Sequence, residues 1–372
     1  MLHFFEKKLR ESHRFLTYFV LPLILVLPSQ AFGVEYFEFY NGIRSLSMGG
    51  ARIAVVNDET ALLVNPAGLG KLRNYFITIV DPEVELGAET QSIVDADILL
   101  FMDIQKTVDK LELSPGKLFH EKIQLFPSFV VPNFGIGLFM RYSMDAISKT
   151  ASPTLYDMDY RNDFAVVTGF NFRLFSGKVK IGFNARAVNR IEVIERDADI
   201  TQTGLTVANT SSEGFGVGSD IGIILTAPWM WLPTFSVVMR DTGGTHFNLN
   251  DGMFHTTATR PNSVAQTIDA AFALFPIASN KSRFAFSGEL RDVLNTREDK
   301  DTMRRVHVGL EYNLADALFI RVGMHQRYWS AGIEIALFNY QLQIGTYGEE
   351  VGVDENNTLE DRRYLLKFSF RF

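Results

Sequence analysis

The sequence of 372 residues contains no cysteine. This absence excludes disulfide bonds, thiolate metal sites, catalytic cysteines and a lipid-modified N-terminal cysteine. No histidine stands beside a recognisable nucleophile motif, and no spacing of acidic residues matches a known metal-binding loop. We therefore expect a protein that is not an enzyme, needs no cofactor and holds no metal.

Long hydrophobic runs are scarce as well. The one prominent run, at 15–27, follows a basic segment at 7–14 and precedes the small-x-small sequence Ser29-Gln30-Ala31. This order is typical of a secretory signal peptide. A membrane anchor is the alternative, but the run is shorter than the roughly 20 residues that a spanning helix needs. We expect residues 1–31 to be a signal peptide, removed after Ala31, so that the protein is exported.

The rest of the chain has no apolar run long enough for a spanning helix, which argues against a helical membrane protein. Hydrophobic residues still make up 47% of the chain, with 32 phenylalanines, so a large core or lipid must take up this surface. The formal net charge is −7, and the basic leader makes the remainder more acidic. Nothing in this balance indicates nucleic acid as a partner.

Alternating apolar and polar residues dominate the chain from about residue 75 onward. In 363–372 one face is mostly polar or charged, and the other consists of Tyr364, Leu366, Phe368, Phe370 and Phe372. The same two-residue period recurs at 134–141, 179–186, 305–312, 320–325 and 332–337. This period is that of β-strands with one apolar face.

The alternation predicts an even number of strands. They are expected at 75–87, 122–131, 134–142, 163–174, 179–190, 214–226, 234–240, 264–274, 283–291, 304–314, 317–325, 328–338, 340–348 and 363–372. A soluble β-sandwich would alternate too. Loop lengths separate the two classes, because outer-membrane barrels have short periplasmic turns and longer outer loops.

The connections between these strands alternate in length as a barrel requires. Counted back from a periplasmic C-terminus, the periplasmic turns are short, and the outer connections are 88–121, 143–162, 191–213, 241–263, 292–303, 326–327 and 349–362, nearly all long. We therefore predict an all-β fold, a 14-stranded antiparallel transmembrane β-barrel at 75–372. Its surroundings would be outer-membrane lipid and lipopolysaccharide.

The outer loops carry further signals. Residues between Ile93 and Leu111 show helical spacing of apolar side chains, and such a helix over the barrel mouth could capture ligand or only cap the barrel. Both alternatives stay open. Two acidic clusters could bind divalent cations that bridge lipopolysaccharide, but no EF-hand spacing supports this, and we expect solvated loop charge. They are Asp157, Asp159 and Asp163, and Asp354, Glu355, Glu360 and Asp361.

The last strand resembles the C-terminal signature by which outer-membrane proteins are recognised for assembly. Its terminal Phe372 is preceded by Phe370 and Phe368 at every second position. We expect these three residues to form an assembly signal for the barrel-assembly machinery.

Residues 32–74 do not alternate, and we expect them to fold as a luminal plug, or hatch. They contain two glycine-rich motifs, Met48-Gly49-Gly50 and Asn65-Pro66-Ala67-Gly68. Glycine permits backbone conformations and close approaches that other residues forbid, which suits a segment packed within a lumen. From composition alone, a compact irregular domain is the simpler interpretation.

The stretch RSLSMGGARIAVVNDETALLVNPAGLG at 44–70 resembles the N-terminal hatch motif of the FadL-type outer-membrane transporter family. PorV and TraF-like outer-membrane barrels share this motif. The resemblance is specific over about 42–87 and architectural beyond. It implies a 14-stranded barrel with a luminal hatch, in which the two glycine-rich motifs act as plug or gate. It also implies passive diffusion of a hydrophobic small molecule, such as a long-chain fatty acid. A PorV-like role in protein secretion or surface attachment is the alternative.

The inner faces of the predicted strands carry charge. The side chains expected to point inward include Arg141, Arg186, His307, Glu311, Arg321 and Glu334. An arginine fork suits the carboxylate of a ligand. The alternative is a paired charge network that fixes hatch and wall, since buried charges are normally paired.

Overall fold

The protein is described by a computed structural model at residues 35, 37–94, 103–149, 154–250 and 252–372. The expected signal peptide at 1–31 lies outside these residues. Among the described residues, no helix is both long and apolar enough to cross a bilayer.

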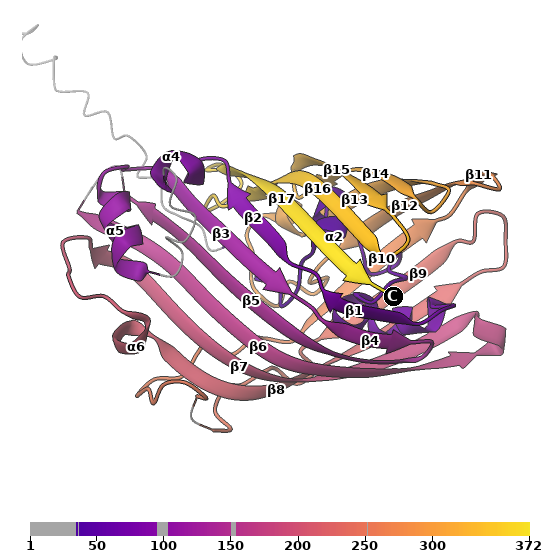
Figure 1. The fold of residues 1–372 in the computed structure, drawn as a ribbon, viewed down its shortest axis with the longest axis horizontal. Coiled ribbons are helices and arrows are strands. Elements are labelled where there is room, and N and C mark those ends of the chain that lie inside the picture. Colours follow the sequence, from indigo (N-terminus) through magenta and orange to yellow (C-terminus); the bar gives the residue numbers. More distant parts are fainter. Residues whose placement is uncertain (1–34, 36, 95–102, 150–153, 251) are drawn as a thin grey trace, which may run out of the picture.

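All strands belong to one antiparallel sheet (Figure 1). They are Phe76–Val80 (β1), Glu83–Gly87 (β2), Leu118–Leu125 (β3), Ser128–Val131 (β4), Phe134–Ser148 (β5), Leu155–Leu174 (β6), Val179–Asp199 (β7), Ser212–Thr226 (β8), Thr234–Arg240 (β9), Thr267–Leu274 (β10), Ile277–Ser279 (β11), Ser282–Leu290 (β12), Val306–Leu314 (β13), Leu318–His325 (β14), Tyr328–Ala336 (β15), Tyr340–Glu350 (β16) and Glu360–Arg371 (β17). The helices are Ile43–Ser47 (α2), Ala61–Val64 (α3), Pro66–Lys71 (η1), Thr90–Val94 (α4), Ile104–Glu112 (α5), Phe175–Gly177 (η3), Val207–Thr210 (α6) and Thr302–Arg305 (η4).

Three strands of the barrel are each interrupted once. The breaks between β1 and β2, β3 and β4, and β10 and β11 contain Pro82, Pro127 and Pro276, and proline has no N–H to donate to a ladder. The two halves of each broken strand share a neighbour, so the elements form 14 barrel strands. The last strand, β17, pairs with both β1 and β2, which closes the barrel. The predicted strand number and closure are confirmed.

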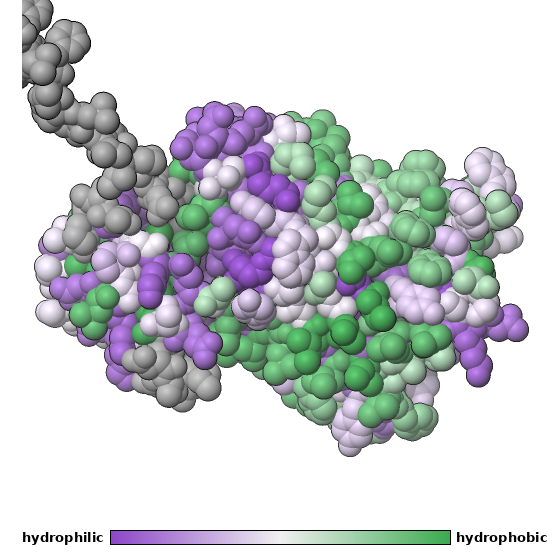
Figure 2. All heavy atoms as spheres, turned by 90° about the horizontal axis from the view of Figure 1, so that it is seen from above, coloured by the Kyte–Doolittle hydropathy of each residue, from purple (hydrophilic) through white to green (hydrophobic). Residues whose placement is uncertain are grey.

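The outer surface of the barrel is apolar. Figure 2 shows hydrophobic residues over the centre and right of the view, away from α4 and α5. Exposed apolar side chains come from strands around the barrel, among them Ile136, Leu138, Val166, Phe170, Phe183, Ile223, Phe235, Phe272, Phe286, Ile320, Ile333, Leu342, Leu366 and Phe368. Apolar surface of this extent, alternating with a polar interior, fits a wall that faces lipid.

The barrel wall is much taller on one side. β6 and β7 contain 20 and 21 residues, whereas β14 contains 8. A spanning strand needs only about 9–11 residues, so β5 to β7 continue well beyond a bilayer. The predicted outer loops at 143–162 and 191–213 are therefore too long, since 143–148, 155–162 and 191–199 extend these strands. The sequence prediction assumed that each strand ends where the membrane ends, whereas β5, β6 and β7 continue beyond it.

Helix α5 explains why these strands can continue. It packs against their outward face, where its buried residues Ile104, Val108 and Leu111 join a cluster with Met144, Ala146, Tyr156, Met158, Tyr160, Ile191 and Val193. The described part of the helix thus covers the outside of the wall and does not lie over the mouth. The part of the predicted helix at 95–102 lies outside the described residues.

The inward face of the extension carries paired charge. Asp157 lies 3.2 Å from Lys149, and Asp163 lies 2.5 Å from Arg141. Arg196 binds both oxygens of Asp159, at 2.9 and 2.8 Å. The expectation that these acidic residues are solvated loop charge is wrong, because the strands turn them into the lumen.

The cover formed by α5 can be tested with Val108→Asp. Placing a charge under the helix forfeits burial worth about 1.5–3 kcal/mol, so we expect the helix to detach from the wall. Protease added to intact cells should then cut the loop between β2 and β3 faster. Lys106→Asp, on the exposed face of the same helix, is the matched control. Equal cleavage of both variants would contradict the packing.

Candidate functional site

The N-terminal segment, residues 37–72, packs against the inward face of strands on several sides of the barrel. Figure 1 shows α2 between the strand layers. Ile53, Leu62 and Leu69 are completely buried, in a cluster that includes inward residues of the wall such as Phe139 and Val167. The apolar residues of the segment therefore share one buried cluster with inward-facing residues of the wall.

Glycines in the wall permit this close approach. A Cβ atom at Gly182 would lie 2.1 Å from the carbonyl carbon of Pro66, and one at Gly222 would lie 2.0 Å from Asn65 Oδ1. On the other side of the barrel, a Cβ at Gly309 would lie 2.2 Å from the carbonyl oxygen of Met48. Any side chain at these wall positions would displace the segment.

Asn65 organises one of the two predicted motifs. Its side chain amide donates to the carbonyl of Ile53 at 2.7 Å and to Ser236 Oγ at 2.8 Å. Its Oδ1 accepts from the N–H of Ala67 at 3.0 Å, which caps η1 with Pro66 in its first turn. A Cβ at Gly68 would lie 2.8 Å from a side-chain carbon of the segment itself. The motif thus bonds the segment both internally and to β9.

The second motif lies against β12 to β15. The N–H of Gly49 donates to Ser330 Oγ at 2.8 Å, and its carbonyl lies 2.8 Å from His307 Nδ1. Arg291 donates to the carbonyl of Gly50 at 2.8 Å. Both glycines have positive φ, +65° and +87°, a conformation that other residues rarely adopt. Met48 is buried beside them.

Three of the predicted luminal residues form one ion-pair chain that reaches the segment. Arg321 binds Glu311 at 2.7 Å and Glu334 at 2.6 Å. Arg44 of α2 lies 3.0 Å from the same Glu311 and 2.5 Å from Asp58. Although burial alone would raise the pKa of Asp58, Arg44 lowers it to about 2. This network ties the segment to β13, β14 and β15.

The other predicted arginines contact the beginning of the segment. Arg186 lies 2.6 Å from Asp220, pairs with Asp241, and stacks 4.7 Å from the ring of Phe39. Arg141 donates to the carbonyl of Glu38 at 2.7 Å. The structure therefore does not bring the six predicted luminal residues together. Glu311, Arg321 and Glu334 form one ion-pair chain. Arg141 and Arg186 contact the beginning of the segment, and His307 lies separately, beside Gly49.

Several residues that bind this stretch were not predicted. Glu38 lies 2.9 Å from Arg52 and 3.0 Å from Arg291. Burial would raise the pKa of Glu38, but Arg291 and Arg52 hold it below its ordinary value, so the carboxylate is ionised. Arg161 and Arg190, which contact Phe37, had been placed in a loop and at a strand end. The alternation of these two arginines with apolar neighbours in the sequence could have indicated that they lie on the inward face of longer strands.

Two cavities lie on either side of the segment. The outer cavity has a volume of about 600 Å³, and its lining includes Glu35, Phe37, Arg161, Arg190, Arg297 and Lys300. The inner cavity has about 160 Å³, and its lining includes Arg44, Asp58, Glu59, Glu311, Arg321 and Lys367. Both are therefore rich in charge, with residues of the segment in each lining.

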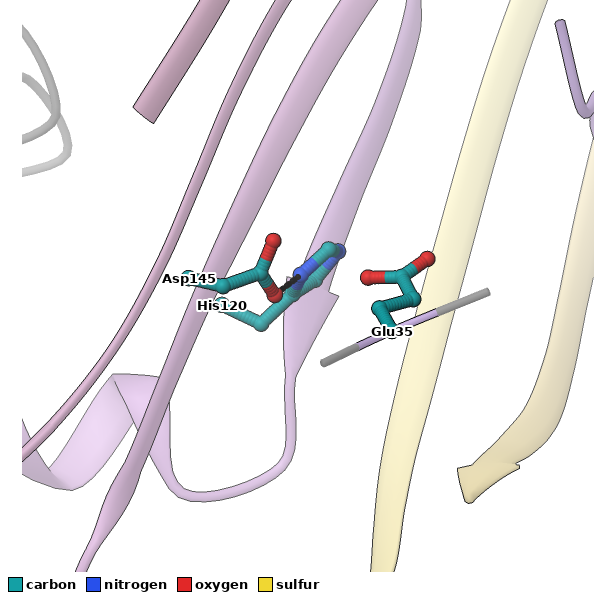
Figure 3. A group of neighbouring side chains, drawn as sticks. All are labelled: Glu35, His120 and Asp145. Atoms are coloured by element: carbon teal, nitrogen blue, oxygen red, sulfur yellow. Dashed lines mark hydrogen bonds and ion pairs between the residues drawn. The ribbon is translucent and has the colours of Figure 1, made fainter. Parts of the chain in front are cut away.

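Glu35, His120 and Asp145 are close enough to be considered as metal ligands (Figure 3), with ligand atoms within 4.8 Å of one another. Both ring nitrogens of His120 are engaged, by Asp145 at 2.6 Å and by Glu85 at 3.0 Å. Arg363 lies 3.1 Å from Glu35 and 3.2 Å from Asp145. Because this guanidinium already supplies the positive charge, we assign the group to the charge network.

Known structures share this architecture. The CymD monoaromatic hydrocarbon channel matches with a TM-score of 0.54 and 10% identity, covering 89% of this chain and 98% of that chain. A deltaS2S3 mutant of the TodX monoaromatic hydrocarbon channel matches with a TM-score of 0.52 and 10% identity, covering 89% and 99%. The chain has the fold of the FadL-type hydrophobic-compound channels. A Pseudomonas aeruginosa FadL homologue is also similar, with a TM-score of 0.49 and 8% identity over 91% and 99% of the two chains. No family model and no curated protein sequence matches this chain.

The packing of the segment can be tested with Gly182→Val. The new side chain would occupy the place of Pro66 and Ala67, so we expect the segment to leave the wall and the lumen to conduct ions several-fold better in planar bilayers. Gly288→Val is the matched control, because a Cβ there meets no atom within 4 Å. Heat-modifiable gel mobility would verify that both barrels are closed. Unchanged conductance in a closed Gly182→Val barrel would contradict the assigned packing.

Proposed function

We propose that the chain is an outer-membrane channel for passive uptake of hydrophobic small molecules, long-chain fatty acids among them. Residues 1–31 would direct export, 32–74 would form the plug, and 75–372 the barrel. The observation that carries the proposal is the fold shared with the CymD and TodX hydrocarbon channels. The apolar belt on the outside of the barrel supports a location in the outer membrane.

The cavities support a route with a barrier in it. The outer cavity of about 600 Å³ is within the range of small-molecule sites. The N-terminal segment lies between it and the charged inner cavity, so a ligand has to displace or bypass this segment. The segment is fixed by hydrogen bonds and ion pairs, each worth about 0.5–3 kcal/mol net. Individual contacts of this strength can be broken and replaced by contacts to a ligand, which suits a gate.

The substrate class can be tested by purification from outer membranes in mild detergent, followed by mass spectrometry of bound lipophiles. We expect a co-purifying apolar compound, and loss of its uptake in a deletion strain without a paralogue. An empty barrel that brings down a secretion component would instead favour the PorV-like role.

The gate can be tested by locking the segment to the wall. Asn65→Cys with Ser236→Cys joins positions whose side chains lie 2.8 Å apart, and the chain offers no competing cysteine. We expect uptake to fall strongly after oxidation and to return after reduction. Each single cysteine variant is the control for loss of the Asn65 hydrogen bonds. Uptake that is the same in the oxidised and reduced double variant would show that this part of the segment does not gate.

A further inference from the structure

Phe37 is surrounded by three guanidinium groups. Arg141 lies 4.9 Å from the ring centroid, Arg161 lies 4.9 Å from it, and Arg190 lies 4.6 Å from it. They project from the neighbouring strands β5, β6 and β7, and we call them the arginine cage. Cations are attracted to the face of an aromatic ring within about 6 Å, and more strongly when water is excluded. The cage therefore fits an aromatic ring.

The cage also has more positive than negative charge. Arg141 and Arg190 share one carboxylate, since Asp163 lies 2.5 Å from the first and 2.6 Å from the second. Arg161 pairs with Glu192 at 2.9 Å. Three cations thus face two carboxylates within 3 Å. Arginine also keeps its charge at any physiological pH, so this excess is permanent.

The next carboxylate does not remove the excess. Asp159 lies 3.9 Å from Arg161, and both of its oxygens are bound by Arg196 at 2.9 and 2.8 Å. Buried charges are normally paired, so an anion next to the ring would be stabilised in this position. A ligand that fits the cage would therefore have a phenyl ring with a carboxylate nearby.

The chain itself supplies such a combination. Glu35, two residues before Phe37, lies 3.1 Å from Arg363. Glu38, the residue after Phe37, is bound by Arg52 and Arg291. One phenyl ring thus lies between two carboxylates that are each bound by arginine. These arginines lie outside the cage, so Phe37 fills the ring position of the cage while its neighbouring carboxylates pair elsewhere.

We propose that the arginine cage is a binding site for aryl carboxylates, and that the ring of Phe37 occupies it until such a ligand displaces the ring. This inference rests on the proposed uptake function and names the substrate class that the outer cavity selects. Glu35, Phe37, Arg161 and Arg190 all line that cavity, so a compound entering it meets the cage directly.

The geometry favours an aromatic acid over an aliphatic one. A guanidinium group is attracted by the quadrupole of a ring face, which an alkyl chain lacks. A neutral aromatic compound would satisfy the ring position but leave the excess positive charge of the cage unpaired. Both the ring and the charge of the ligand should therefore contribute to binding.

The test uses the purified full-length mature protein in detergent and isothermal titration with phenylpropionate. Cyclohexylpropionate keeps the charge without the aromatic ring, and phenylpropanol keeps the ring without the charge. We expect each comparator to bind roughly tenfold more weakly than phenylpropionate, as expected from the loss of one cation–π or charge-assisted contact. Equal binding of all three compounds would overturn the proposal.

The competition is tested by Phe37→Ala, which empties the cage without touching its arginines. We expect phenylpropionate to bind roughly tenfold more tightly to this variant. Phe175→Ala is the control, because Phe175 lies exposed in a turn at the other end of the barrel. Affinity that is the same in all three proteins would overturn the role of Phe37. Phe37→Leu, which keeps apolar volume and removes the ring, should give the same direction if the alanine variant does not assemble.

Hydrogen exchange provides a second readout in the wild-type protein. Phenylpropionate should speed exchange of the amides at 37–41, because the displaced stretch loses its contacts, whereas Arg190→Met should abolish this response. Faster exchange that persists in Arg190→Met would overturn the assignment of the cage. Uptake in cells separates the two proposals. Binding at the cage without uptake of any hydrophobic compound would refute only the channel, and uptake without binding at the cage would refute only this inference.

Discussion

The structure depends on the closure of one β-sheet. In a bilayer every backbone N–H and C=O has to be bonded within the protein, and closure achieves this without a free edge. It also forces each strand to turn one face to lipid and the other to the lumen. The polar side chains that cannot face lipid therefore gather inside, where they need partners. The ion pairs among Arg321, Glu311 and Glu334, and those of Arg363, follow from this requirement.

The N-terminal segment supplies many of the missing partners. Arg44 pairs with Glu311, Glu38 pairs with Arg291, and the backbone of Gly49 and Gly50 contacts His307 and Arg291. Segment and wall are thus complementary in charge as well as in shape. The described part of the N-terminal segment is thus joined to the wall by polar contacts on several sides of the barrel.

Much of the barrel could be predicted from sequence, because two-residue alternation is a local property. The strand containing Phe368 and Phe370 illustrates this, with a lipid-facing row and a luminal row readable from the letters. The extension of β6 and β7 could not be placed, since its outward residues, such as Met158 and Val193, are covered by a helix far away in the chain. The arginine cage was missed for a related reason, because Phe37 meets its three cations only after closure. The wall glycines Gly182 and Gly309 stood in the luminal rows, but only the structure shows what they make room for.

The two proline breaks near the start of the barrel face each other across one seam. β1 pairs with β4 and β2 pairs with β3, and between these ladders the N–H of Phe126 donates to the side chain of Asp81, at 2.5 Å. The seam therefore has fewer backbone hydrogen bonds between its strands than an unbroken ladder would have. We expect this seam to deform more readily than a continuous ladder such as that of β7 with β8.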